Sequence, residues 1–144
     1  MYDIERVGKV IADVQKYIKE LDSYQIKEAE DLNDSKNYYA TSMIAFAVLN
    51  RVIDLGSEII SAENLGAPNT YKDIMPALAK ANVINKEQAA QLGSMIGKRN
   101  VLAHLYEDIN EKDLFKIVKE INLIEKFIAT VKKRIATHEE KDKD

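Results

Sequence analysis

The stretch that decides the fold is SKNYYATSMIAFAVLNRVIDLGSEIISA, residues 35–62. Apolar residues recur along it in two adjacent stripes, one with Ala45, Val48, Val52, Leu55 and Ile59 and the other with Phe46, Leu49, Ile53 and Ile60. Two neighbouring stripes cover most of a helix's circumference, as in a helix that packs on several sides. Its polar remainder is narrow: Asn50, Asp54 and Ser57 lie along one line, with Arg51 and Glu58 beside it. We therefore predict a central helix over residues 35–62.

Two outer segments carry a single apolar stripe each. These stripes are Ile4, Val7, Ile11, Val14, Ile18 and Leu21 in the first, and Leu114, Ile117, Ile121, Ile124, Ile128, Val131 and Ile135 in the last. A fourth long helix is predicted from the capping pair Asn85 and Gln88 to about Ala103. A short helix is predicted after the loop 64–70, capped by Thr70 with Asp73, with Pro76 inside it. The prediction is an all-α, up-and-down helical bundle of four long helices plus one short helix over residues 1–137, with a frayed charged tail at 138–144.

Composition narrows the function. The 144 residues include no cysteine, which excludes disulfides, zinc–thiolate sites and thiol nucleophiles. The net charge of −3 is unlike that of a protein that coats nucleic acid through bulk positive charge, so any nucleic-acid site must be local. The longest apolar run, residues 43–49, is far shorter than the ~20 residues that cross a bilayer. We expect a cytoplasmic protein without a membrane partner.

The segment KRNVLAHLY, residues 98–106, holds the residues best suited to chemistry. Arg99 stands five residues before His104, which places the two about 140° apart on a straight helix. Asn100 lies one turn before His104, and Tyr106 follows the expected helix end. The other histidine, His138, is interpreted as a solvated residue of the tail.

An arginine and a histidine together can cleave RNA without a metal or cofactor. The arginine fork binds a phosphate at two points, and a histidine takes up and returns protons near neutral pH. This is sufficient for attack of a ribose 2′-OH on the adjacent phosphorus. A single Arg–His pair is sparse for an active site, so we expect a symmetric homodimer that brings two copies to one cleft.

The string from Arg99 to Tyr106 resembles the Arg-x4-His-x-Tyr signature of HepT-like proteins, in the HEPN superfamily of small α-helical ribonucleases. The likeness extends to residues 51–56, 69–71, 95–99 and 106–109, although Lys98 stands where an aromatic residue is common. The resemblance implies an RNase toxin partnered by an MNT-type nucleotidyltransferase antitoxin. It assigns phosphate contact to Arg99, acid–base work to His104, AMP acceptance to Tyr106 and, less directly, a polar position facing the site to Asp54.

Plainer interpretations stay open for the same residues. Arg99 and His104 could be an ordinary surface cation and a helix-capping residue, which would leave a non-catalytic helical subunit that binds a nucleotidyltransferase. An intrahelical ion-pair line could form from Arg51, Asp54 and Glu58. A metal site could form from His104, Glu107 and Asp108. A core, dimer or base-stacking surface could include Tyr38 and Tyr39. No metal and no cofactor are predicted.

Overall fold

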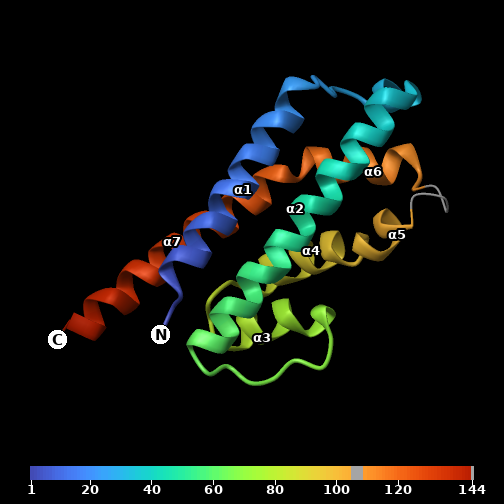
Figure 1. The fold of residues 1–144 in the computed structure, drawn as a ribbon. Coiled ribbons are helices and arrows are strands. Elements are labelled where there is room, and N and C mark those ends of the chain that lie inside the picture. The colour runs from blue at the N-terminus through green and yellow to red at the C-terminus, as the bar shows by residue number, and fades with distance from the viewer. Residues whose placement is uncertain (105–108, 144) are drawn as a thin grey trace.

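The computed structural model describes residues 1–104 and 109–143, and this part of the chain contains helices and turns but no strand (Figure 1). The prediction of an all-α fold is confirmed. In chain order the elements are α1 (Ile4–Ser23), the 3-10 turn η1 (Ala29–Asn33), α2 (Ser35–Ala62), the 3-10 turn η2 (Tyr71–Asp73), α3 (Ile74–Lys80), α4 (Lys86–Ile96), α5 (Arg99–Ala103), α6 (Glu111–Lys119) and α7 (Ile121–Lys143).

Helix α2 is the centre of the bundle, as the two apolar stripes predict. It begins at the cap Asp34, whose carboxylate accepts from the Asn37 N–H at 3.0 Å. Val52 and Ile59, from the more buried stripe, have no exposed surface. Helix α2 contacts α1 and α7 as well as α3, α4, α5 and α6, and Figure 1 shows α1 running alongside it. Helices from both ends of the chain therefore pack against α2.

Local signals set several of the helix starts. The capping boxes predicted at Thr70 with Asp73 and at Asn85 with Gln88 both form, and they precede α3 and α4. Pro76 is the third residue of α3, where its missing N–H costs no helical hydrogen bond because the first turn has no partners for its N–H groups.

The prediction of one continuous fourth long helix is wrong, because this segment forms two helices, α4 and α5. Helix α4 ends at the cap Gly97, and the Lys98 N–H bonds to the Met95 carbonyl three residues back, at 3.1 Å. Glycines at positions 93 and 97 weaken the helix here, since glycine loses more backbone freedom than other residues. The last predicted helix is likewise divided, at Glu120, into α6 and α7.

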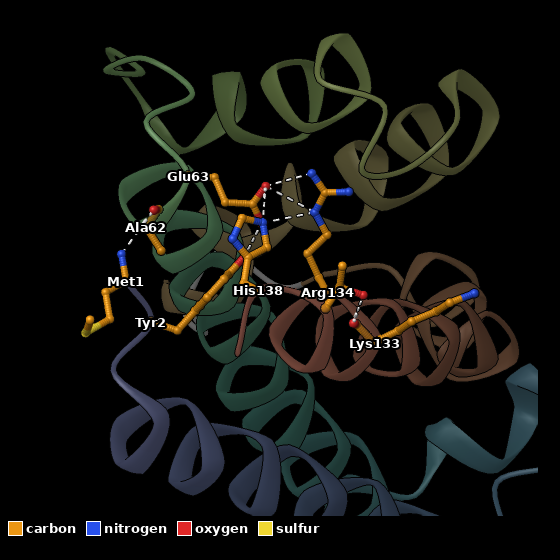
Figure 2. A network of polar contacts seen from close by, with 8 residues as sticks. Met1, Tyr2, Ala62, Glu63, Lys133, Arg134 and His138 are labelled. Atoms are coloured by element: carbon orange, nitrogen blue, oxygen red, sulfur yellow. Dashed lines mark hydrogen bonds and ion pairs between the residues drawn. The ribbon is translucent and has the colours of Figure 1, made fainter. Parts of the chain in front are cut away.

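The charged tail differs most from its prediction. Helix α7 continues to Lys143 rather than ending near residue 137, and His138 is held within the fold. Figure 2 shows Arg134 and His138 pointing toward the carboxylate of Glu63. This side chain is only 5% exposed; its carboxylate accepts from Arg134 Nε at 3.1 and 3.0 Å and from Arg134 Nη2 at 2.7 Å, and it lies 3.3 Å from His138 Nε2. The Tyr2 hydroxyl donates to the same carboxylate. A nearly buried carboxylate requires such partners, and one face of α7 supplies two of them.

The network also perturbs the pKa of its members. Burial tends to raise the pKa of the Glu63 carboxyl, but the hydrogen bonds from Arg134 and Tyr2 outweigh it and hold that pKa below its usual value. The pKa of Tyr2 is raised, first by burial and then by its hydrogen bond to Glu63. The first residues, the end of α2 and the last turns of α7 are thus joined at one end of the bundle.

Across residues 1–104 and 109–143, each helix is either too short or too polar to cross a membrane.

Candidate active site

Arg99 is the first residue of α5, directly after the interruption that follows α4. Its half-buried side chain crosses to α2, where Nε donates to Asn50 Oδ1 at 2.9 Å. Its Nη1 donates to Asn100 Oδ1 at 3.2 Å. Two neutral amide oxygens therefore hold one side of the guanidinium group.

Two aromatic rings also lie near the Arg99 guanidinium. Its Cζ lies 5.7 Å from the ring centre of Phe46 on α2 and 5.8 Å from that of Tyr71 in η2. Both distances are within the range of a cation–π interaction. Among the described residues no carboxylate pairs with Arg99. Arg51 and Arg134, by contrast, both pair with acidic side chains.

A glycine on α2 explains how Tyr71 reaches this position. A Cβ atom built on Gly56 would lie 2.5 Å from Cγ2 of Ile74, so only glycine allows α3 to approach α2 this closely. Turn η2 leads directly into α3, and the close packing of α3 therefore carries Tyr71 toward Arg99. The Tyr71 hydroxyl is buried and has no hydrogen-bond partner among the described residues.

His104 is the cap that ends α5, with φ −111° and ψ 70° and its N–H bonded to the Val101 carbonyl at 3.2 Å. Its exposed side chain and Arg99 stand at the two ends of a five-residue helix, which rises about 7 Å. The other motif residue, Tyr106, lies outside the described residues, as do Glu107 and Asp108 of the metal-site interpretation.

Asp54 takes part in an ion pair with Arg51. The Arg51 Nη1 donates to Asp54 Oδ2 at 3.2 Å, and Arg51 Nε lies 3.5 Å from Asp13 Oδ2 on α1. The ion-pair interpretation of Arg51 and Asp54 is confirmed, whereas Glu58 accepts instead from the Asp3 N–H at the start of α1. Asp54 lies one turn after Asn50, which makes the polar contact to Arg99.

Three residues around Arg99 are not part of the sequence motif: Asn50, Phe46 and Tyr71. The sequence pattern could have pointed to Asn50, because this residue stands on the polar line of an otherwise apolar helix. Phe46 looks like an ordinary member of an apolar stripe. Nothing in the spacing of Tyr71 points to Arg99, since the two come together only through the packing of α3.

Tyr38 belongs to the core, as the plainer interpretation predicted. It is buried and donates from its hydroxyl to the Ile109 carbonyl at 2.7 Å. Tyr39 is 51% exposed and meets the edge of Tyr38 at 5.1 Å between ring centres.

Comparison with known proteins shows the family of this chain. The chain matches the family described as Ribonuclease HepT-like over residues 14–132, and it belongs to that family. It is 30% identical over 81 residues to the mRNA nuclease HepT of Shewanella oneidensis, in a match that covers 56% of this chain and 61% of that relative's length.

Solved structures share the fold along almost the whole chain. An AMPylated HEPN toxin of S. oneidensis, in complex with an MNT antitoxin, superposes with a TM-score of 0.81 and 24% identity over 92% of this chain and 98% of that one. The cytosolic protein YutE of Bacillus subtilis superposes with a TM-score of 0.80 and 19% identity over 96% and 95%. The helical fold of HEPN proteins is therefore the fold of this chain.

Proposed function

We propose that this protein is a metal-independent endoribonuclease in which Arg99 binds the RNA phosphate and His104 transfers protons. The observation that carries the proposal is the environment of Arg99. Its side chain is half-buried, oriented by Asn50 and Asn100 and flanked by two rings, yet the described residues leave its positive charge without a carboxylate. An arginine held in place by neutral groups keeps its full charge for an anion.

The proposed reaction follows from the two groups. His104, in its neutral form, takes the proton from a ribose 2′-OH, whose oxygen attacks the adjacent phosphorus. The bond from phosphorus to the 5′-oxygen breaks, that oxygen receives a proton, and a 2′,3′-cyclic phosphate remains. Arg99 stabilises the negative charge that builds on the phosphate oxygens. Asn100 supports the reaction by holding Nη1. Asp54 lies one turn after Asn50 on α2, and its ion pair with Arg51 leaves it out of the proposed proton transfers.

A homodimer would complete this site. Attack and departure of the 5′-oxygen each need a proton carrier, and one chain offers a single His104. Tyr39 and Met43, one turn apart on α2, are 51% and 58% exposed, and Val101 on α5 is 38% exposed. Apolar side chains exposed on the two helices that carry the site favour a two-fold interface there. The second chain of the homodimer would then supply the second His104.

The proposed partner is an MNT-type nucleotidyltransferase antitoxin, and the proposed setting is the cytoplasm. Support comes from the solved complex of an AMPylated HEPN toxin with an MNT antitoxin. We propose Tyr106 as the AMP acceptor, because an adduct two residues from His104 would bring bulk and negative charge to the place where RNA phosphate docks. Incubation with the cognate transferase, ATP and Mg²⁺ should add AMP to Tyr106 and lower RNase activity. Tyr106→Phe should still cut RNA and escape this inhibition.

The test of the nuclease itself is RNA cleavage by the purified protein in the presence of a chelator. Wild-type protein should cut, and His104→Ala should lose activity while keeping its helical circular dichroism, because His104 is an exposed helix cap. Equal cleavage by His104→Ala, or loss of wild-type activity on chelation, contradicts the mechanism. Absence of any cleavage would favour the non-catalytic subunit instead.

A further inference from the structure

The two rings beside Arg99 come from segments that are distant in sequence, α2 and η2. We infer that Phe46 and Tyr71 are positioning residues that hold the Arg99 guanidinium in the orientation that leaves Nη2 for a phosphate. This inference rests on the proposed function, because RNA phosphate is the anion that Arg99 would bind.

The rings supply a constraint that the asparagines lack. The hydrogen bonds to Asn50 and Asn100 involve Nε and Nη1, and among the described residues Nη2 has no hydrogen-bond partner. Hydrogen bonds lie near the plane of a guanidinium group, so they fix its in-plane direction better than its tilt. Aromatic rings attract the cation from outside these hydrogen bonds, and this attraction restricts the tilt.

Rings are also suited to this task because they do not neutralise the arginine. A carboxylate in the same place would orient Arg99 equally well, but it would occupy the N–H donors and compete with phosphate. The acidic partners of Arg51 and Arg134 show that this chain uses carboxylates where an arginine serves structure. Arg99 has amides and rings instead.

Matched substitutions test the inference. Phe46→Leu and Tyr71→Leu keep apolar bulk but remove the ring, and each should lower kcat/KM on RNA by about five- to thirtyfold. Phe46→Tyr and Tyr71→Phe restore a ring and should recover most of that loss. The control is Phe115→Leu, which removes a similar contact on α6, 5.9 Å from Lys119 Nζ. It should leave kcat/KM within about twofold of wild type, because α6 contributes none of the described side chains that hold Arg99.

A second readout does not depend on RNase activity. In the His104→Ala background, 15N relaxation of the Arg99 Nε–Hε signal, assigned with Arg99→Lys, should give the high order parameter of an ordered guanidinium group. Phe46→Leu and Tyr71→Leu should lower this order parameter toward that of a mobile arginine side chain, and Phe115→Leu should not. An Arg99 order parameter unchanged by both leucine substitutions overturns the inference, whether or not the protein cuts RNA. A wild-type protein without RNase activity whose Arg99 order parameter falls as expected in the leucine variants would retain the positioning role and refute the proposed function.

Discussion

Arg99 Nε donates a hydrogen bond to Asn50 Oδ1 at 2.9 Å, which joins the short helix α5 to the central helix α2. The two residues are 49 positions apart, and the bond exists only because α5 packs across α2. The strongest polar anchor of the candidate site is therefore a product of the tertiary fold.

Replacing this anchor should affect catalysis more than folding. Asn50→Ala is expected to lower kcat/KM on RNA by about tenfold, since a hydrogen bond to a charged group contributes roughly 1.5 kcal/mol. Asn50→Asp should lower it further, because the new carboxylate would pair with Arg99 and compete with phosphate. The ion pair between the new carboxylate and Arg99 should keep the thermal midpoint of Asn50→Asp equal to or above that of wild type. An Asn50→Asp protein as active as wild type would refute the role assigned to the neutral amide.

The close packing of α3 gives a second prediction. Gly56→Ala forces its Cβ against Cγ2 of Ile74 and should lower both the thermal midpoint and RNase activity, because displacement of α3 also displaces Tyr71. Adding Ile74→Ala should recover part of the activity despite its own cavity cost. Gly8→Ala in α1 is the matched control, since its Cβ meets nothing within 4 Å and should be neutral or stabilising. Equal behaviour of the two alanine variants would count against the steric argument.

A third prediction concerns acid stability through Glu63. The pKa of this carboxyl is lower in the folded protein than its ordinary value of 4.5, so the ionised form stabilises the fold. That contribution is fully present above about pH 4.5 and is lost as the pH falls through the lowered pKa. Glu63→Gln should reduce the free energy of unfolding at pH 7 by roughly 2–4 kcal/mol, less than for a fully buried pair because Arg134 is partly exposed.

Urea titrations at several pH values measure this effect. The stability difference between wild type and Glu63→Gln should shrink from pH 7 toward pH 3. Glu139→Gln, at an exposed carboxylate next to His138 on α7, should match wild type throughout. A difference that stays constant with pH would show that Glu63 acts through packing alone.

The apolar surface on α2 predicts the oligomeric state. The wild-type protein should sediment as a dimer at tens of micromolar, with an interface above about 1,000 Å². Met43→Glu should yield monomers and lower RNase activity at the same time, whereas Ile4→Glu, at another exposed apolar residue, should remain dimeric. A fully active monomer would refute the shared site.

Local patterns in the sequence predicted the helices. They could not predict the contacts of the site, because those contacts join residues that are distant in sequence. The double stripe of residues 35–62 and the capping boxes at Thr70 and Asn85 depend on neighbours in the chain, and each formed as predicted. The interruption at Gly97 was missed because two glycines in an amphipathic pattern do not reveal whether the helix continues. Tyr71 and the Glu63 network were missed because both depend on contacts between distant segments.

The central claim, that His104 and Arg99 direct attack by a ribose 2′-OH, has a direct test. A short RNA cut by the protein in chelator is resynthesised with a single 2′-deoxy nucleotide immediately 5′ of the cleaved bond, and its products are analysed by mass spectrometry. We predict a 2′,3′-cyclic phosphate from the all-ribose RNA and no cutting at the substituted bond. Cleavage of the 2′-deoxy substrate at the same bond and rate would contradict the mechanism.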